Sequence, residues 1–320
     1  MTPLTWIITE GITGTENQCL GIAEALGIEA VTKRVKLNEP WKTLSPYLGF
    51  ETEASFSSEG DILSPPWPDL VIASGRKSIA ASRFIKRKNK RTIVVQVQDT
   101  RTRRSEFDLL VVPEHDPAAK LDQQNIFVTT ATPNRITDAK LAAAREKFVR
   151  FQSLSAPRIA VLIGGTAGKQ VLTEEMVKIL AAQLKALDAK GYGLMITTSR
   201  RTGEANKQIL IEELKGTKAY IWDGIEENPY FSFLAWADAL IVTSESMSML
   251  SEAATTGKPV YMVDLGGAKP RHKQMQQNLK NKGIIRNFEG KIDEWSYKPL
   301  RDADAVAQEI RRRFGGKAGF

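Results

Sequence analysis

The sequence has a single cysteine and only two histidines among its 320 residues. Cys19 on its own excludes an intramolecular disulfide and a metal site built from cysteines. His115 and His272 lie too far apart in the sequence to indicate a metal cluster by themselves. Because the side chains that usually bind transition metals are scarce, we expect no metal and no bound cofactor.

Long apolar runs are also absent. None approaches the ~20 residues that a helix needs to cross a bilayer, and no basic start, apolar core and cleavage site follow Met1. Hydrophobic residues make up 42% and charged residues 26% of the chain, which is ordinary globular composition. These features predict a cytoplasmic protein and leave open a peripheral position at the inner membrane.

The chain carries a net charge of +8, and one segment is especially basic. Between residues 83 and 104, Asp99 is the only acid beside nine basic residues, which are Arg83, Lys86, Arg87, Lys88, Lys90, Arg91, Arg101, Arg103 and Arg104. Two interpretations stay open: a solvated helix end with its loop, or a patch for an anionic membrane or an acidic substrate. No nucleic acid is expected, because no aromatic interleaving or nucleic-acid motif accompanies the charge.

Short β-branched runs alternate with helical segments throughout the chain. This pattern is typical of parallel sheets covered by helices on both faces. Strands are expected at residues 5–9, 30–36, 70–73, 92–98, 109–112, 126–129, 158–163, 193–198, 219–221, 239–242 and 259–263. Helices are expected at 17–27, 41–49, 76–88 and 137–150, after residues 173, 203, 230, 247 and 275, and at 302–314.

The segment 151–157 (FQSLSAP) breaks one helix and precedes a new strand, so we expect a domain boundary there. The predicted fold class is α/β, with two Rossmann-like domains and parallel sheets. Residues 1–152 form the first domain and residues 153–298 the second. The final segment, 299–320, is expected to form a helix that packs back on the first domain. Two such domains facing one another would leave a ligand-binding interdomain cleft.

Three loops pass directly from a strand into a helix and are rich in glycine, serine or threonine: residues 11–16, 164–166 and 244–248. Exposed N–H groups at a helix start favour phosphate, and small residues let a diphosphate approach the backbone. Residues 74–76, 98–101 and 198–201 also follow strands. The alternative is a set of tight turns without a ligand.

Five segments together resemble a known family: residues 11–18 (GITGTENQ), 164–166 (GGT), 198–201 (TSRR), 245–253 (ESMSMLSEA) and 257–260 (GKPV). They look like the bacterial branch of the mitochondrial-fission, or elongated-mitochondria, family, and the likeness covers essentially the whole chain. That family looks related to glycosyltransferases of the GT-B type. Residues 251–260 (SEAATTGKPV) are similar to the donor-site helix of the N-acetylglucosaminyltransferase that forms lipid II.

The resemblance implies that a nucleotide-diphosphate sugar, as a UDP-sugar, binds the second domain as substrate without a metal ion. Gly164, Gly165 and Thr166 would approach the diphosphate. The helix start at residues 246–248 would donate N–H groups to it, and Glu252 would hold the ribose hydroxyls. The implied site comprises Gly14, Gly164, Gly165, Thr166, Ser199, Arg200, Arg201, Ser244, Ser246, Met247, Ser248 and Glu252.

Catalytic candidates come from the first domain. The lipid II-forming enzyme ends its N-terminal glycine-rich loop with a histidine, and the matching position here is Glu16. This carboxylate is our first candidate general base, with Asp99 the second; Glu16 alternatively complements the dipole of its own helix. Arg76 and Arg101, each following a strand end, are expected to contact an anion or the acceptor, with plain solvent exposure as the alternative.

Three functions follow. The first is a metal-independent glycosyltransferase that moves the sugar to an envelope-type or lipid-linked acceptor. The second is a nucleotide-sugar epimerase, which shares the donor site but needs acid and base groups on both faces of the sugar. The third is a non-catalytic GT-B-like adaptor that recruits a protein partner at a membrane surface, as the eukaryotic branch is thought to do for a fission dynamin. Whether the chain is an enzyme stays open at this point.

Overall fold

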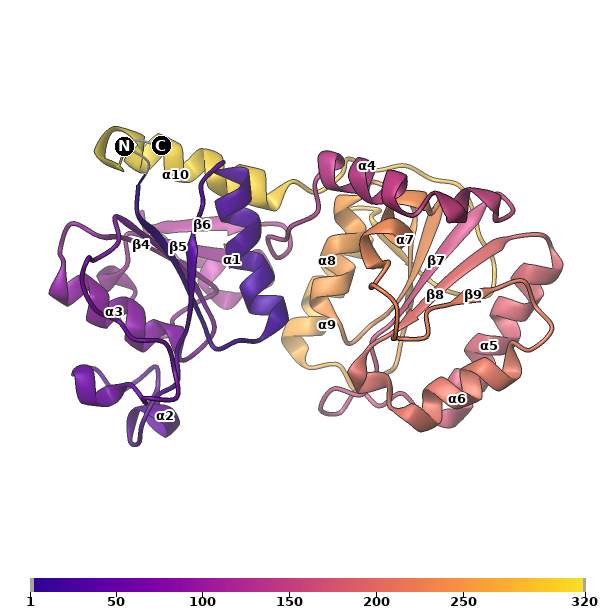
Figure 1. The fold of residues 1–320 in the computed structure, drawn as a ribbon, viewed down its shortest axis with the longest axis horizontal. Helices are drawn as coiled ribbons and strands as arrows, with labels where there is room; N and C mark the ends of the chain where they lie inside the picture. The colour runs from indigo at the N-terminus through magenta and orange to yellow at the C-terminus, as the bar shows by residue number, and fades with distance from the viewer. Residues whose placement is uncertain (1–2, 319–320) are drawn as a thin grey trace. The chain divides into compact units, whose positions relative to one another are not determined.

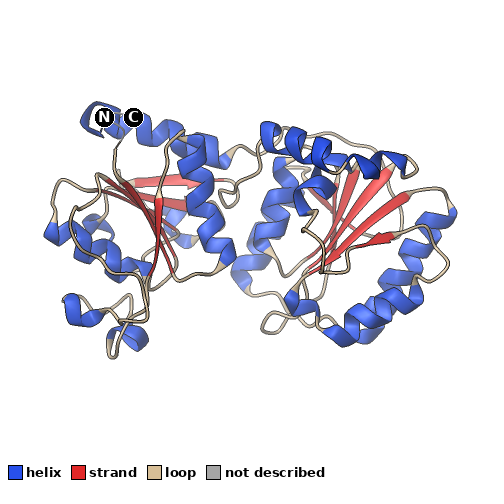
Figure 2. Cartoon of the chain, viewed as in Figure 1, coloured by secondary structure: helices blue, strands red, loops and turns tan. Residues whose placement is uncertain are grey.

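The computed structural model describes residues 3–318. They form two compact units: unit 1 combines the chain up to Arg135 with the residues from Arg301 onward, and unit 2 is Ile136–Leu300 (Figure 1). Each unit contains one six-stranded parallel sheet with helices on both faces (Figure 2). The predicted fold class, α/β with two Rossmann-like domains, is confirmed.

Unit 1 has the strand order β2-β1-β3-β4-β5-β6. Its strands are β1 (Thr5–Thr9), β2 (Val31–Arg34), β3 (Leu70–Ser74), β4 (Ile93–Val97), β5 (Leu109–Pro113) and β6 (Ile126–Thr129). Its α-helices are α1 (Thr13–Ala25), α2 (Trp41–Leu44), α3 (Ser78–Lys88) and α10 (Asp302–Ala318). Helix α1 begins four residues before the predicted start, so Gly14 and Glu16 belong to its first turn.

Strands β1, β3, β4 and β5 of unit 1 are buried at every position, because most of their residues are apolar. In β1, Ile7 packs into one core cluster with α1 and α10. The neighbouring Trp6 and Ile8 point the other way, into a second cluster with Phe84 of α3. Successive side chains of a strand alternate between faces, so a continuous apolar run feeds two separate cores.

Unit 2 has the strand order β12-β11-β10-β7-β8-β9. Its strands are β7 (Arg158–Ile163), β8 (Gly193–Thr198), β9 (Tyr220–Ile221), β10 (Ala239–Thr243), β11 (Val260–Val263) and β12 (Ile285–Asn287). Its α-helices are α4 (Asp138–Lys147), α5 (Glu174–Ala189), α6 (Glu204–Glu213), α7 (Tyr230–Trp236), α8 (Met247–Thr255) and α9 (Pro270–Asn281). Strand β12 was not predicted, and α9 begins at Pro270, six residues before the predicted start after residue 275.

The boundary between the units differs from the predicted one at residue 152, because α4 belongs to unit 2. Ser232 of α7 donates its hydroxyl proton to the Ala144 carbonyl at 2.8 Å, and the Trp236 indole N–H donates to the Arg145 carbonyl at 3.2 Å. These contacts tie α4 to α7. The chain therefore leaves unit 1 before this helix rather than after it.

The last helix returns to unit 1. Val306 and Ile310 of α10 are buried in the same core cluster as Ile22 of α1, and α10 runs beside α1 (Figure 1). The Arg311 guanidinium donates to the Leu26 carbonyl at the end of α1 at 2.9 Å. Unit 1 is thus completed by the far end of the chain.

Each sheet has one point where the strand order reverses. In unit 2, β7 starts the sheet; β8 and β9 follow on one side, and β10, β11 and β12 on the other. The corresponding point in unit 1 lies between β1 and β3. In open α/β sheets, ligands bind outside the carboxyl ends of the strands at this switch point. The loops after β7 and β10 are therefore the first place to search for a site.

Candidate functional site

Three loops meet at the carboxyl edge of the unit 2 sheet: those after β7, β8 and β10. The Gly164 N–H, just after β7, donates to the Thr243 hydroxyl at the end of β10 at 2.8 Å. The Gly164 carbonyl accepts from the hydroxyls of Thr202, at 2.8 Å, and Ser199, both after β8. The structure thus brings together Gly164, Gly165, Thr166, Ser199, Arg200, Arg201, Ser244, Ser246, Met247 and Ser248 in one unit.

The β7 loop requires glycine at positions 164 and 165 for a reason other than the predicted approach of a diphosphate. A Cβ at Gly164 would lie 1.6 Å from Oε1 of Glu245. At Gly165, where φ is +131°, a Cβ would lie 2.1 Å from the Arg201 carbonyl oxygen. Both positions are closed to a larger side chain by neighbouring protein atoms. Their glycines therefore serve the packing of the three loops, which by itself does not call for a diphosphate.

The N–H groups of the β7 loop are also largely used within the protein. Thr166 donates its N–H to the Arg201 carbonyl at 3.1 Å, and its hydroxyl accepts from the Leu172 N–H at 3.2 Å. Since Gly164 donates to Thr243, two of the three expected diphosphate donors point into the protein. The N–H groups of Gly164 and Thr166 therefore hold the neighbouring loops together and are not available to a ligand.

The start of α8 keeps the donors that the β7 loop lacks. Ser246 is the N-cap residue, and its hydroxyl accepts from the Met249 N–H at 3.4 Å. The first N–H groups of a helix have no partner inside the helix, and here these belong to Met247 and Ser248. This turn directly follows the β10 end of the switch point, a position where helix N–H groups can donate hydrogen bonds to an anion.

The Ser244 side chain, by contrast, is buried and structural. Its hydroxyl oxygen accepts from the Leu265 N–H at 3.0 Å and from the Gln170 side-chain amide at 3.1 Å. It joins the loops after β7, β10 and β11. The prediction that Ser244 contacts the nucleotide sugar is therefore not supported by the position of its side chain.

Glu245 is the residue that sequence reasoning missed. Its side chain is fully buried, and Oε1 accepts from the Arg201 guanidinium at 3.2 Å. Its Oε2 is buried without a hydrogen-bond partner. Burial raises the pKa of this carboxyl, with Arg201 among the groups that oppose the rise. A buried acid next to a helix start is unexpected at an anion site; its one sequence signal is a charged residue inside a small-residue loop.

Arg200 and Arg201 supply positive charge at the same edge. The Arg201 side chain is 46% exposed while it contacts Glu245, and Arg200 is exposed. Ser199 holds this turn, because its hydroxyl accepts from the Arg201 N–H at 3.1 Å. All three residues lie on the loop after β8, with Ser199 acting through the backbone, and their contact with an anion stays a prediction.

Glu252 lies further along α8 and already has a protein partner. Its Oε2 accepts from the Tyr230 hydroxyl at 2.5 Å. Burial raises the pKa of Glu252 to about 7, and the Tyr230 hydrogen bond opposes the rise. A ribose would therefore have to share this carboxyl with Tyr230.

The two predicted bases of unit 1 are both in ion pairs. Glu16 accepts from the Arg34 guanidinium at 2.7 and 2.9 Å. The hydrogen bond from Arg34 lowers the pKa of Glu16, against the effect of burial. Asp99 accepts in the same bidentate way from Arg104, at 2.7 and 2.9 Å. Neither carboxylate is free to accept a proton without giving up an arginine.

The predicted anion contacts Arg76 and Arg101 differ from each other. The Arg76 guanidinium donates to the carbonyls of Lys42, Thr43 and Ser45 at 2.7 to 3.1 Å. It thereby closes the end of α2, which is a structural role, and its predicted anion contact stays a prediction. Arg101 is exposed, with a left-handed backbone at φ +64°.

Gly14 lies in the first turn of α1, where it is partly buried. The turn belongs to unit 1, at the switch point between β1 and β3. Gly14 is thus in a different unit from the β7, β8 and β10 loops.

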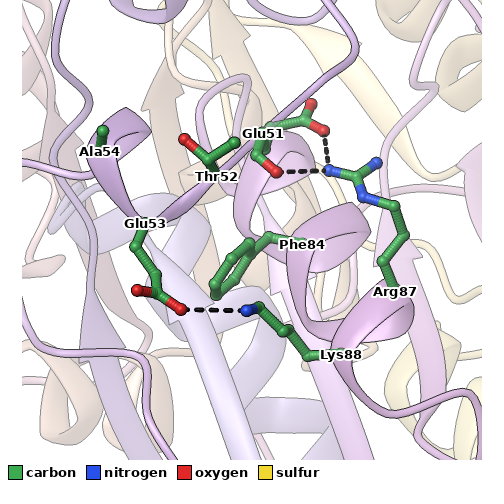
Figure 3. Close-up of a pocket in the computed structure, with 7 residues that line it drawn as sticks. All are labelled: Glu51, Thr52, Glu53, Ala54, Phe84, Arg87 and Lys88. Atoms are coloured by element: carbon green, nitrogen blue, oxygen red, sulfur yellow. Dashed lines mark hydrogen bonds and ion pairs between the residues drawn. The ribbon is translucent and has the colours of Figure 1, made fainter.

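The basic segment 83–104 is largely neutralised by acids that lie elsewhere in the sequence. Arg83 is buried and pairs with Glu51, which also accepts from Arg87. Figure 3 shows the contacts of Arg87 with Glu51 and of Lys88 with Glu53. The Lys88–Glu53 distance is 2.9 Å, and these residues line a cavity of about 400 Å³. Lys86 pairs with Asp108, and Arg103 with Glu106. The interpretation as a solvated helix end is closer to the structure than a free cationic patch.

Residues 3–318 contain neither a candidate membrane-spanning helix nor a cluster of metal-binding side chains. None of their helices has the length and hydropathy to cross a membrane. Within the same stretch, no three or more His, Cys, Asp or Glu side chains come together as a metal site would require.

Two six-stranded parallel sheets, each with its switch point, define a two-domain α/β protein with the GT-B fold. Two known structures match nearly the whole chain. One is the UDP-GlcNAc 2-epimerase from Methanocaldococcus jannaschii, with a TM-score of 0.57, 13% identity and coverage of 98% of this chain and 99% of that one. The other is MurG from Acinetobacter baumannii, with a TM-score of 0.51, 14% identity and coverage of 99% and 94%.

The chain belongs to the mitochondrial fission ELM1 family, whose model matches residues 13–314. It is 28% identical over 388 residues to the mitochondrial fission protein ELM1 of Arabidopsis thaliana, across 97% of this chain and 91% of the relative. The family resemblance inferred from the five sequence segments is confirmed. A further structure of the M. jannaschii epimerase, in complex with UDP-GlcNAc and UDP, matches with a TM-score of 0.51 and 15% identity, over 98% of this chain and 99% of that one; these structural likenesses establish the fold.

Proposed function

We propose that this protein is a metal-independent glycosyltransferase that binds a UDP-sugar at the carboxyl edge of the unit 2 sheet and transfers the sugar to an envelope-type or lipid-linked acceptor. The observation that carries the proposal is the start of α8, capped by Ser246, beside the β7–β10 switch point. An M. jannaschii protein of the same fold forms a complex with UDP-GlcNAc and UDP. That complex supports a nucleotide sugar as the ligand class.

The diphosphate would accept hydrogen bonds from the Met247 and Ser248 N–H groups. The α8 dipole favours negative charge at this end, and Arg200 and Arg201 add two cations close by. As the sugar leaves, charge develops on the diphosphate, and preorganised N–H groups and guanidinium groups stabilise it without a metal ion. Glu252 would accept a hydrogen bond from a ribose hydroxyl, either in addition to the hydrogen bond from Tyr230 or in its place.

The general base is proposed from unit 1. Both candidates are held in a bidentate pair with an arginine, Glu16 with Arg34 and Asp99 with Arg104, and the backbone around Asp99 favours the second. Asp99 lies in a segment where three non-glycine residues, Gln98, Arg101 and Arg103, have positive φ. Backbone strain of this kind clusters at functional sites. Asp99 would need Arg104 to move before it accepts the acceptor's proton.

Calorimetric titration with UDP, UDP-GlcNAc and UDP-glucose, each with and without EDTA, tests the donor site. ADP and GDP serve as controls for recognition of the uracil nucleobase. We expect selective binding of the uridine compounds that EDTA leaves unchanged. Arg201→Gln should weaken it about tenfold or more, in line with a lost charge-assisted hydrogen bond. Arg91→Gln, an exposed arginine of unit 1, is the matched control.

Two outcomes would redirect the proposal. Absence of binding to every nucleotide would favour the adaptor function. Binding followed by inversion at C2 of the sugar, monitored by NMR of UDP-GlcNAc without an acceptor, would identify an epimerase instead. Transfer of labelled sugar to an extracted lipid acceptor, abolished in Asp99→Asn, is the result expected for the glycosyltransferase.

A further inference from the structure

Glu245 places a negative group where the proposed function needs positive ones. It directly precedes the N-cap Ser246 of α8, and its fully buried carboxyl contacts Arg201 at 3.2 Å. An ionised carboxylate at this point opposes the binding of a diphosphate through like-charge repulsion, which is strong in a buried setting. The same carboxylate holds the arginine that the diphosphate would need.

The carboxyl is only partly compensated when ionised: the Thr243 hydroxyl, the Glu245 and Gly165 N–H groups and Arg201 oppose the effect of burial, which still raises its pKa. Oε2 is buried and without a hydrogen-bond partner, and the guanidinium that contacts Oε1, that of Arg201, is 46% exposed. The close fit of Gly164, whose Cβ would fall 1.6 Å from Oε1, leaves the side chain no room to turn toward the β7 loop. Glu245 therefore stays in place when a ligand arrives, and its charge is the property that can change.

We propose that Glu245 makes diphosphate binding at this site proton-coupled: the ligand takes over Arg201, and Glu245 takes up one proton from the buffered solvent. This inference rests on the proposed function, since it concerns the same donor site. In the free protein, Arg201 balances the ionised carboxylate. In the complex, Arg201 and the α8 N–H groups balance the diphosphate, and the carboxyl is neutral. The site then admits a dianion without carrying two unbalanced negative groups.

The direction of titration agrees with this exchange. Burial raises the pKa of Glu245 even with Arg201 beside it, so removing Arg201 raises the pKa further. Other charged or ionisable groups lie on the surrounding elements. They are Glu252 on α8, Asp264 after β11 and His272 on α9, with Arg200 on the β8 loop and Lys169 on the β7 loop as further charges.

Two of these groups need controls. The pKa of Glu252 is about 7, and burial lowers the pKa of His272, whose Nδ1 lies 3.3 Å from Gln170 Oε1. Gln170 in turn donates to Ser244, next to Glu245. Glu252→Gln and His272→Gln each remove one alternative proton acceptor while keeping a side chain of polar character.

The experiment is calorimetric titration with UDP-GlcNAc in buffers of different ionisation enthalpy, which measures the protons taken up per ligand bound. UDP-GlcNAc suits the test because its diphosphate is esterified at both ends and does not titrate near neutral pH. We expect the wild type to take up protons as it binds, up to one per ligand, and its affinity to fall as the pH rises, by at most about tenfold per pH unit.

Glu245→Gln should abolish the uptake and flatten the pH dependence, while Glu252→Gln and His272→Gln should retain both. Arg201→Gln is a second variant: without its cation, Glu245 already holds more proton in the free protein, so the uptake falls. Circular dichroism checks that each variant is folded. Tight wild-type binding with no proton uptake, or uptake that persists in Glu245→Gln, would overturn the inference and leave the proposed function standing. Loss of all nucleotide binding by the wild type would overturn both.

Discussion

At the scale of single residues, the buried carboxyl of Glu252 belongs to the candidate site and also makes the folding stability depend on pH. Burial raises its pKa to about 7 from an ordinary value of 4.5. Between these pH values the folded protein binds more protons than the unfolded chain, so this group's contribution to stability is fully present below about pH 4.5 and is lost as the pH rises through about 7. A neutral amide of the same shape would avoid that loss.

We predict that Glu252→Gln raises the free energy of unfolding at pH 8 by up to about 3 kcal/mol, because the isostere needs no proton to stay buried. The gain should shrink toward zero near pH 4.5. Urea unfolding monitored by circular dichroism between pH 4.5 and 8.5 measures it. Glu146→Gln, at an exposed position of α4, is the matched control, and a gain that does not vary with pH would contradict the explanation.

Removing the side chain, in Glu252→Ala, should weaken UDP binding if Glu252 holds the ribose, by about 1 to 3 kcal/mol for a hydrogen bond left unreplaced. Glu252→Gln is the milder variant, because its amide oxygen can still accept from a ribose hydroxyl. Titration of Glu252→Ala with UDP at pH 8 measures the loss. Unchanged affinity would remove the ribose assignment.

Sequence patterns located the strand ends of the site, but the individual roles depend on contacts between distant residues. Gly164 looked like a phosphate-loop glycine, yet the atom that excludes its side chain belongs to Glu245. Arg76 looked like an anion contact, yet it binds the carbonyls of α2. A residue type and its position after a strand do not specify which partner arrives from elsewhere in the chain.

At the scale of elements, the buried apolar runs were the reliable signal. All five residues of β1, β3 and β4 are buried, and each of these strands was predicted. Strand β12 has three residues, of which two are exposed, so it carries almost no apolar pattern. Helix α2 likewise spans four residues without a buried one, and the sequence predicted a longer helix there.

Helix α2 depends on Arg76 rather than on its own packing. The guanidinium donates to three carbonyls at its end, and the Ser45 hydroxyl donates back to the Arg76 carbonyl at 2.9 Å. We predict that Arg76→Gln lowers the local opening free energy of residues 41–48 by about 1 to 3 kcal/mol. Faster amide hydrogen exchange there, with exchange in unit 2 unchanged, is the expected result.

Arg91→Gln provides the control for this experiment, because Arg91 is also an exposed arginine of unit 1 but lies away from α2 in the sequence. Amide exchange of Ser45 is the most direct probe, since its N–H donates to the Trp41 carbonyl at 2.9 Å. Unaltered protection of this amide in Arg76→Gln would show that α2 holds without the arginine.

At the scale of the whole molecule, the two units differ in how they use the chain. Unit 2 is one continuous stretch, Ile136–Leu300, whereas unit 1 needs residues from both ends. The alternation of strands and helices predicted two sheets, because it depends on local patterns. The same pattern placed the domain boundary after α4 rather than before it. The packing of α4 on α7 decides the boundary, and it joins segments that are far apart in the sequence, so a local pattern does not reveal it.

The return of α10 gives the last prediction. Val306, Ala307 and Ile310 are fully buried against Ile7 and Ile22. Burying a valine or isoleucine side chain contributes about 1.5 to 3 kcal/mol each, so their joint removal takes away a large share of the 5 to 15 kcal/mol typical of a domain. A chain ending at Leu300 should therefore lose the cooperative unfolding of unit 1 and keep that of unit 2.

A chain ending at Phe314 is the matched control, because it keeps the three buried side chains and Phe314, which packs against the same cluster. Hydrogen exchange separates the units, since β1 and β3 report on unit 1, and β7 and β10 on unit 2. We expect the shorter chain to lose protection in β1 and β3 alone, and the longer one to match the wild type. Equal protection in both truncated chains would mean that α10 covers a core already stable without it, and the unit 1 sheet would then be an independently folding domain.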